Sequence, residues 1–189
     1  AVSRSIEVSA TNDAPVLAGM ETASLAYSEG DGPKAITETL TLSDADDGSL
    51  ASAVVEITSG FKAAEDQLAF TPEGGITGTL SGNTLTLTGP ASLADFQSVL
   101  RSVTYQNTSL DPSTDLRTVA FTVNDGEAAS NAVSRSIEVS ATNDAPVLAL
   151  SGGGRINYQE NDPPLPVSNG LVVADPDHSN LQSATITIA

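Results

Sequence analysis

Residues 1–18 have the sequence AVSRSIEVSATNDAPVLA, and the same stretch returns without change at residues 132–149. The offset (132 − 1 = 131) continues without a gap, because eleven of the 40 pairs formed by residues 19–58 and 150–189 are identical. Self-similarity at a fixed offset indicates tandem repeats. The sequence therefore predicts one complete repeat at 12–142. Residues 1–11 would be the final strand of a preceding repeat, and residues 143–189 the opening strands of the next, truncated repeat.

Short segments of alternating apolar and polar residues fill the complete repeat, separated by turns rich in Gly and Asp. These segments are 16–17, 25–27, 36–42, 53–58, 67–70, 78–80, 84–88, 102–106, 117–123 and 133–139. Such alternation is typical of half-buried strands, and the turn spacing favours an antiparallel Greek-key β-sandwich. One segment differs, because Ser92 and Asp95 have the spacing of a helix capping box. We expect an all-β fold with one short inserted helix at 92–100, and a loop at Gly152–Gly154.

Composition excludes several classes of function. The net charge is −17 and the isoelectric point about 4.1, which disfavours nucleic acid and anionic membranes. The chain has no Cys and one His, so neither a thiolate site nor a multi-histidine metal site is possible. Paired carboxylates can hydrolyse glycosides, but that chemistry needs a cleft, and the chain has no Trp to build a sugar platform. We expect no enzymatic activity, and we expect His178 to be a solvent-facing loop residue.

The acidic residues gather in predicted loops rather than along strand faces. These loop groups are Asn12-Asp13, Glu29-Gly-Asp31, Asp44-Ala-Asp46-Asp47, Asp111 to Asp115, and Asn124-Asp125. Close carboxylates repel unless a cation lies among them, and Ca²⁺ takes six to eight oxygen ligands. The alternative is a solvated acidic surface in which Asp and Asn only form turns.

Recurrence of the acidic residues one period later favours the metal interpretation. Four acidic positions between residues 19 and 58 are acidic again after 131 residues, namely Glu29, Asp31, Asp44 and Asp46. Four others change, namely Glu21, Glu38, Asp47 and Glu56. The residues that recur lie in the loop motifs, so the sequence predicts calcium as a cofactor.

The motifs together resemble a known family. The ordered set Tyr27-Ser-Glu29, Asp44-Ala-Asp46, Val123-Asn-Asp-Gly126 and Ile137 to Pro146 is similar to cadherin repeats. The insertion Leu93-Ala-Asp-Phe-Gln-Ser-Val-Leu100 and the segment 118–126 resemble the cadherin-like extender repeats of giant bacterial RTX-type surface adhesins. The resemblance covers the whole chain and implies a cadherin- or immunoglobulin-like sandwich.

Strand direction sorts the acidic loops into two ends of the predicted sandwich. With Asn12 and Asp13 at one end, the 44–46 loop and Asp125 lie at that same end. Glu29 and the 107–116 loop lie at the other. The resemblance implies that calcium binds between consecutive repeats. The predicted metal ligands are Asn12, Asp13, Glu29, Asp44, Asp46, Asp111, Asp115, Asp125, Asn143, Asp144, Glu160, Asp175 and Asp177.

The resemblance implies a function as well as a fold. We expect a calcium-rigidified extender repeat of a bacterial cell-surface adhesin, located outside the cell, that projects distal adhesive domains for attachment or biofilm formation. Its partners would be neighbouring repeats joined through calcium, with host, surface or matrix ligands bound by the distal domains, and without membrane insertion. The alternative is a cadherin-like module of the biofilm matrix that binds carbohydrate or protein. Residues 143–189 cannot close a core alone, so we expect the missing strands to come from further sequence or from another chain.

Overall fold

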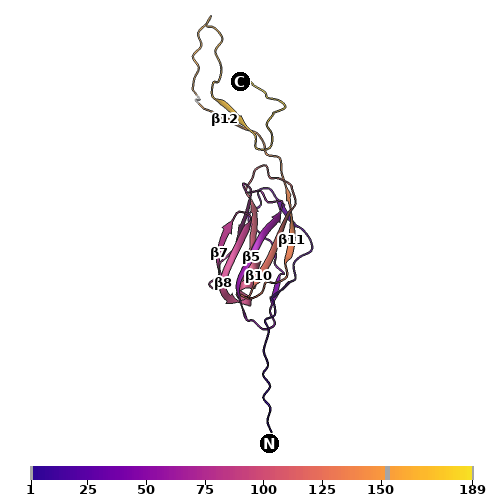
Figure 1. The fold of residues 1–189 in the computed structure, drawn as a ribbon. Coiled ribbons are helices and arrows are strands. Elements are labelled where there is room, and N and C mark those ends of the chain that lie inside the picture. Colours follow the sequence, from indigo (N-terminus) through magenta and orange to yellow (C-terminus); the bar gives the residue numbers. More distant parts are fainter. Residues whose placement is uncertain (1, 152–153, 189) are drawn as a thin grey trace. The chain divides into compact units, whose positions relative to one another are not determined.

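The computed structural model describes residues 2–151 and 154–188, so two of the glycines expected in the 152–154 loop lie outside the described residues. The chain divides into two compact units, Ala1–Ala141 and Thr142–Ala189, and each is described by itself (Figure 1). The predicted all-β sandwich with one short helix is confirmed in the first unit. The elements of this unit are β1 (Val16–Ala18), β2 (Leu25–Ser28), β3 (Lys34–Ala35), β4 (Thr41–Ser43), β5 (Ser49–Ser59), β6 (Asp66–Ala69), β7 (Thr77–Ser81), β8 (Thr84–Ser92), α1 (Leu93–Arg101), β9 (Thr104–Asn107), β10 (Arg117–Asn124) and β11 (Val133–Ser140).

A six-stranded sheet in the order β2-β11-β10-β5-β8-β7 forms the main layer of the first unit (Figure 1). All of its ladders are antiparallel except the one between β11 and β2, which is parallel. A three-stranded sheet, β3-β9-β6, and a short β1-β4 ladder complete the unit. Strands from distant parts of the sequence are therefore neighbours, and their loops meet at the two ends of the unit.

Alternation along the central strands builds the core. In β10, Val119, Phe121 and Val123 are buried while the residues between them are partly exposed, and β5 buries Val55 and Ile57. Side chains of a strand point to opposite faces in turn, so one face of the sheet is apolar.

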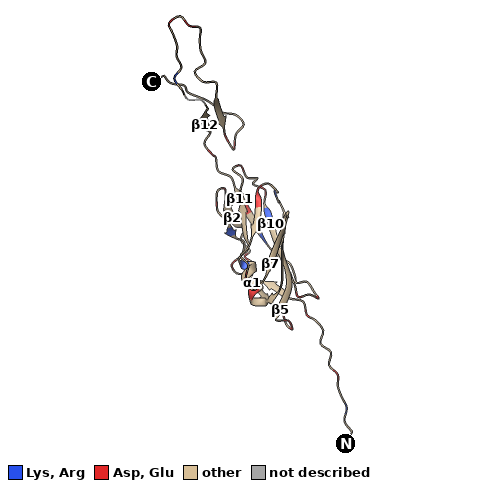
Figure 2. Cartoon of the chain, turned by 90° about the vertical axis from the view of Figure 1, so that its left-hand side faces the viewer, with Lys and Arg blue, Asp and Glu red and all other residues tan. Residues whose placement is uncertain are grey.

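The inserted helix closes the core. α1 contacts β4, β5 and β8, and Figure 2 shows it beside β5. It begins at Ser92, whose hydroxyl oxygen accepts a hydrogen bond from the N–H of Asp95 at 3.1 Å. The helix buries Phe96, Val99 and Leu100. Ser92 is therefore the N-cap of the helix, as the spacing predicted, and its hydroxyl donates to Asp95 Oδ2 at 2.7 Å.

The predicted strand at 36–42 is wrong as a single element. Residues 36–40 leave the sheets between β3 and β4. Their backbone is held by side chains instead, because one carboxylate oxygen of Glu21 accepts the N–H groups of Glu38 and Thr39 at 2.8 and 3.2 Å. Thr37 accepts the N–H of Leu40 at 3.2 Å. Local side-chain hydrogen bonds compete with a ladder and here turn the chain from one sheet to another.

The second unit reproduces the opening of the first. Its strands β12 (Val147–Leu150) and β13 (Leu171–Ala174) pair in the register of β1 and β4, shifted by one period. The Tyr158 hydroxyl donates to the Asp162 carbonyl at 2.6 Å, as the Tyr27 hydroxyl donates to the Asp31 carbonyl. Asn161 has φ 71°, where Gly30 has φ 76° in the first unit. Asn tolerates this left-handed conformation better than most residues, so the turn is retained.

Candidate metal site

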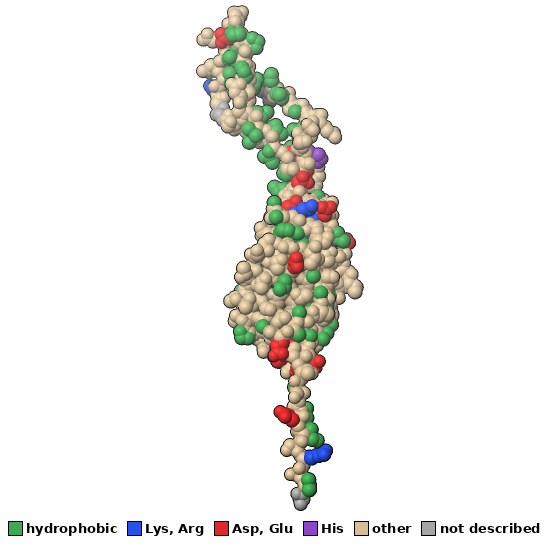
Figure 3. Space-filling view, viewed as in Figure 1, with side chains coloured by type: hydrophobic (Ala, Val, Ile, Leu, Met, Phe, Trp, Pro, Cys, Tyr) green, Lys and Arg blue, Asp and Glu red, His purple; other side chains and the backbone are tan. Residues whose placement is uncertain are grey.

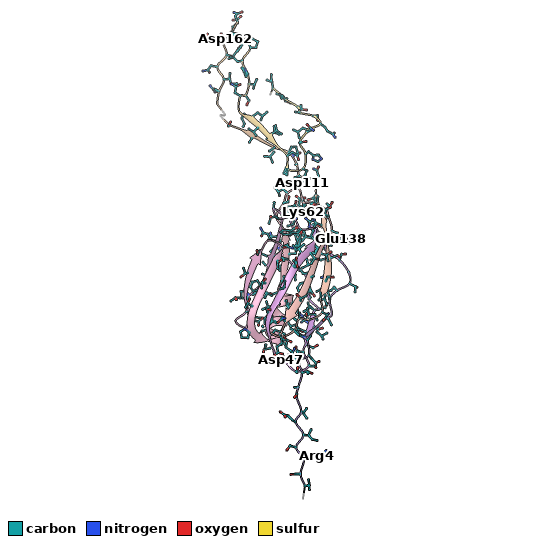
Figure 4. The ribbon with its side chains drawn as sticks, viewed as in Figure 1. Arg4, Asp47, Lys62, Asp111, Glu138 and Asp162 are labelled. Atoms are coloured by element: carbon teal, nitrogen blue, oxygen red, sulfur yellow. The ribbon has the colours of Figure 1, made fainter. Side chains whose placement is uncertain are left out.

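Three loops bring acidic groups together at one end of the first unit. We call this set the acidic cluster, and it consists of Asn12, Asp13, Asp44, Asp46, Asp47 and Asp125. Its residues precede β1, follow β4 and follow β10. The cluster lies at the end marked by Asp47 in Figure 4, and Figure 3 shows acidic side chains gathered there. The predicted grouping of the 12–13, 44–46 and 125 loops therefore holds.

Hydrogen bonds connect the segment that enters the repeat to both of the other loops. The N–H of Asp13 donates to the carboxylate of Asp46, at 3.3 and 3.2 Å to its two oxygens. The side-chain amide of Asn12 donates to Asp125 Oδ2 at 3.0 Å. The Asn-Asp pair thus ties the entering segment to the end of the sandwich.

Each acidic loop is shaped by its own carboxylate. Asp44 Oδ1 accepts the N–H groups of Asp46 and Asp47 at 3.1 and 3.0 Å. Asp125 Oδ1 accepts those of Glu127 and Ala128 at 2.6 and 2.7 Å. Asp side chains stabilise turns in this way. In each case Oδ1 holds the loop; Asp125 Oδ2 accepts the side-chain amide of Asn12, whereas Asp44 Oδ2 has no hydrogen-bond partner.

The second oxygen of Asp44 carries the strongest indication of a ligand. Asp44 Oδ2 is buried and has no hydrogen-bond partner. One carboxylate oxygen from each of Asp44, Asp47 and Asp125 lies within 4.8 Å of the others. Two ligands on opposite sides of a calcium ion, each at 2.3–2.6 Å, are about 5 Å apart, so this spacing fits one ion. A buried carboxylate oxygen without a partner is costly, and a cation would satisfy it.

The pKa values within the acidic cluster diverge. Hydrogen bonds from the N–H groups of Asp47 and Asp46 lower the pKa of Asp44, although the charge of Asp125 opposes this. The N–H of Asp13 favours the charged form of Asp46. Desolvation and the carboxylates of Asp44 and Asp13 outweigh it and raise the pKa of Asp46. When neighbouring carboxylates shift each other's pKa values in opposite directions, the site carries excess negative charge. None of the ion pairs found among the described residues involves the cluster.

The second unit repeats the hydrogen bonds of the 12–13 and 44–47 loops one period later. Asp175 Oδ1 accepts the N–H groups of Asp177 and His178 at 3.1 and 3.0 Å. The N–H of Asp144 donates to Asp177, and the side-chain amide of Asn143 donates to the Asp144 carbonyl at 2.9 Å. Ligand atoms of Asp175, Asp177 and His178 lie within 4.8 Å of one another.

The opposite end of the first unit holds the remaining predicted ligands of that unit. Glu29 follows β2, and its N–H donates to the carbonyl of Ser140 at 2.9 Å. Asp111 lies at the end opposite Asp47 in Figure 4. The carboxylate of Asp115 is engaged by Lys62 Nζ at 2.8 Å, and this contact lowers the pKa of Asp115. Asp111 is therefore the better ligand candidate of the two. Glu160 occupies the turn of the second unit that corresponds to Glu29.

A buried ionic network supports this opposite end, and no sequence pattern pointed to it. The side chains of Arg117 and Asp66 are fully buried, with Arg117 Nη2 at 3.2 Å from Asp66 Oδ1 and 3.1 Å from Glu65 Oε2. Asp66 also accepts the hydroxyl of Tyr105 at 2.6 Å. Arg117 donates to the carbonyls of Ser113 and Asp115, so the network fixes the loop before β10.

The predicted ligands do not include Asp47 of the acidic cluster, nor His178, which lies beside Asp175 and Asp177 in the second unit. They occupy equivalent positions one period apart, so Asp47 is not among the acidic residues that recur. Both side chains nevertheless lie among the acidic groups of their units. Asp47 offers the carboxylate oxygens that calcium prefers, whereas His178 offers ring nitrogen, which is typical of zinc sites.

Comparison with known proteins shows a similarity to part of a much longer protein. Residues of this chain are 40% identical over 86 residues to halomucin from Haloquadratum walsbyi, a match that covers 42% of this chain and 1% of halomucin. Halomucin is therefore a very much longer protein. No known family profile and no solved structure matches the chain. Among the described residues, no helix is long and apolar enough to cross a bilayer.

Proposed function

We propose that the chain is a calcium-stiffened spacer repeat of a large cell-surface adhesin. The observation that carries this proposal is the buried, unpartnered Asp44 Oδ2 beside oxygens of Asp47 and Asp125. Similarity to part of the much longer halomucin supports a place within a long repetitive protein. The resemblance to cadherin-like extender repeats supports an extracellular, adhesive role.

The donor set fits a hard cation. The acidic cluster offers only carboxylate, amide and carbonyl oxygens, which are the ligands that calcium prefers. Asp44, Asp47 and Asp125 would hold the ion, with Asp46, Asp13 and Asn12 adjacent. When bound, calcium would neutralise the mutual repulsion of these carboxylates. The second unit would use Asp144, Asp175 and Asp177 in the same way.

Stiffening follows from where Asn12 and Asp13 lie in the sequence. They belong to the Asn-Asp-Ala-Pro segment that joins consecutive repeats in the proposed array. In the first unit this segment is already hydrogen-bonded to Asp46 and Asp125. An ion shared by those loops would fix the direction in which the chain enters the repeat. Neighbouring repeats are accordingly the proposed partners, and the role is structural rather than enzymatic.

Isothermal titration calorimetry tests the proposal. The full chain, stripped with EDTA, should bind calcium with a Kd of about 10⁻³ M or lower, the upper limit for extracellular calcium modules. Magnesium, which demands tighter octahedral geometry, should bind more weakly. Asp44→Asn should weaken calcium binding in the first unit. Glu138→Gln is the matched control, because Glu138 is exposed on β11 and lies far from Asp47 in Figure 4. Absence of calcium binding up to 10 times that limit would refute the proposal.

A further inference from the structure

The strand β7 forms one edge of the six-stranded sheet and lies far from both ends of the sequence (Figure 1). It pairs with β8 and, within the described part of the chain, with no other strand. An edge strand presents unpaired backbone groups, and proteins commonly protect such edges with charged residues, Pro or β-bulges. β7 has none of these features, because its residues are uncharged, include no Pro and pair with β8 without a register shift. The edge strands of the smaller sheet, β3 and β6, carry Lys34 and Asp66 instead.

The hairpin of β7 and β8 determines which backbone groups point outward. Its two-residue turn begins with Gly82 at φ 59°, as a type II′ turn requires. The pair that flanks such a turn, Ser81 and Thr84, exchanges both of its backbone hydrogen bonds. Hydrogen-bonded and non-hydrogen-bonded pairs then alternate along the ladder. The N–H and C=O groups of Gly78 and Leu80 therefore point away from β8, towards the open edge.

The core-facing side of β7 is only partly covered. Leu80 lies beside the buried Leu85, yet it is 47% exposed. Gly78 lies beside the buried Leu87, and the ring of Phe70 occupies the place of its missing side chain. A Cβ atom on Gly78 would lie 2.3 Å from Phe70 Cε1. The edge thus presents an exposed leucine and, two residues away, a phenylalanine ring that lies over a glycine.

The distribution of charge favours a second copy of the chain at this edge. Residues 74–94 contain no charged side chain, although the chain has 24 acidic and 7 basic residues. The area over β7 is accordingly free of acidic and basic side chains in Figure 3. Two copies with a net charge of −17 repel one another, and this repulsion decays over about 8 Å at physiological ionic strength. The repulsion is therefore weakest where two uncharged edges meet.

We propose that β7 of one copy pairs antiparallel with β7 of a second copy, about a two-fold axis at Thr79. This register places Gly78 of each copy beside Leu80 of the other, so that the outward N–H and C=O groups of both residues can be bonded. Each exposed Leu80 would lie against the Phe70 ring of the other copy, where Gly78 has no side chain to obstruct it. Addition of a strand to an open sheet edge is a common mode of recognition, and here the two surfaces are identical, so the contact closes as a dimer.

This contact is separate from the proposed binding of calcium. It uses no residue of the acidic cluster, so either proposal can fail without the other. Pairing through β7 would hold two spacers side by side on a surface. Two linked molecules bind a shared target more strongly than one, because the second binding event becomes intramolecular.

Cysteine cross-linking tests the register, because the chain has no cysteine of its own. In Thr79→Cys, the two thiols would face one another at a non-hydrogen-bonded pair with Cα atoms about 4.5 Å apart, within reach of a disulfide. Thr86→Cys is the matched control, because Thr86 is exposed and lies beside Thr79 on β8. Its two copies would be three strand spacings apart, about 14 Å, which a disulfide cannot bridge.

Mild oxidation of the full chain is carried out in EDTA, so that no metal can bridge carboxylates of two copies. Thr79→Cys should give a covalent dimer on a non-reducing gel, and Thr86→Cys should give little. Equal yields from the two variants, or no dimer from Thr79→Cys, would overturn the proposal.

Sedimentation equilibrium of the full chain, also in EDTA, supplies an independent readout. The contact is smaller than a standard protein interface, so wild type should dimerise weakly, as its concentration rises towards about 1 mM. Thr79→Asp should weaken dimerisation by about fivefold or more, because like charges directly opposite one another destabilise paired strands. Thr86→Asp adds the same charge to the same exposed face, away from the axis, and should weaken it much less. A monomer at every concentration, or equal weakening by the two variants, would contradict the proposed contact.

Discussion

Replacing Asp44 by Asn separates the role of its carboxylate in the loop from its proposed role in binding calcium. Asn retains a side-chain carbonyl oxygen that can accept the N–H groups of Asp46 and Asp47. It removes one charge and the buried Oδ2 that has no partner. The loss of charge-assisted hydrogen bonds lowers the free energy of unfolding, whereas the relief of repulsion with Asp125 raises it. Without calcium, we expect the free energy of unfolding to change by about 1 kcal/mol or less, within the range of a net hydrogen bond.

With calcium, the two proteins should diverge. A site that binds only the folded state stabilises it by RT ln(1 + [L]/Kd), which is about 1.4 kcal/mol at ten times Kd and about 2.7 kcal/mol at 100 times Kd. If the substitution weakens affinity tenfold, the first of these gains falls to about 0.4 kcal/mol in the variant. We therefore expect Asp44→Asn to change the free energy of unfolding only slightly in EDTA. In calcium, the variant should lose about 1 kcal/mol of the stabilisation that calcium gives to wild type.

Urea unfolding followed by circular dichroism measures both quantities. Wild type, Asp44→Asn and Glu138→Gln are compared at pH 7 in EDTA, in calcium and in magnesium. Glu138→Gln should keep the whole calcium gain, because its side chain lies on an exposed strand face. An equal calcium gain in wild type and Asp44→Asn, or no gain in wild type, would refute this reasoning.

Three further changes test other parts of the account. Asp66→Asn should destabilise the fold by about 3–5 kcal/mol, because it leaves the buried Arg117 guanidinium without a main partner, and the urea midpoint measures this. Glu21 is partly buried, which opposes ionisation, but hydrogen bonds from Glu38 and nearby Thr hydroxyls lower its pKa to about 2 from an unperturbed 4.5. The extra stability of wild type relative to Glu21→Gln should thus be fully present above pH 4.5 and lost as the pH falls towards 2. A stability difference that does not depend on pH would contradict this. Ser92→Ala should cost about 1 kcal/mol by removing the N-cap of α1, visible as a lower melting temperature; an unchanged value would argue against the cap.

The sequence predicts a strand correctly where the alternation of apolar and polar residues within that strand is enough to determine it. β10 and β11 follow the predicted segments 117–123 and 133–139 to within one residue. A strand with one buried and one exposed face must alternate apolar and polar residues, and both segments do so. The segment 36–42 has the same alternation but is broken. The cause is the carboxylate of Glu21, some seventeen residues earlier, and no local pattern contains that contact.

The candidate site also has parts that the sequence predicts and parts that it does not. The grouping of Asp13, Asp46 and Asp125 follows from strand direction, because loops at the same end of a sandwich must meet. Recurrence of acidic residues does not identify Asp47, because its counterpart one period later is His178. The pairing of Arg117 with Asp66 joins positions 51 residues apart, and each lies in a strand that alternation alone would explain. Such contacts depend on the sheet order, which the sequence does not state directly.

The central claim is that calcium fixes the segment entering the repeat, and NMR relaxation of its backbone amides tests this most directly. The amides of Asn12 and Asp13 are compared with those of Val119 in the core, in EDTA and in saturating calcium. With calcium, the order parameters of residues 12 and 13 should rise to about 0.85, the value of rigid backbone. In EDTA they should be clearly lower, while Val119 remains unchanged. Order parameters at residues 12 and 13 that are the same with and without calcium would contradict the account.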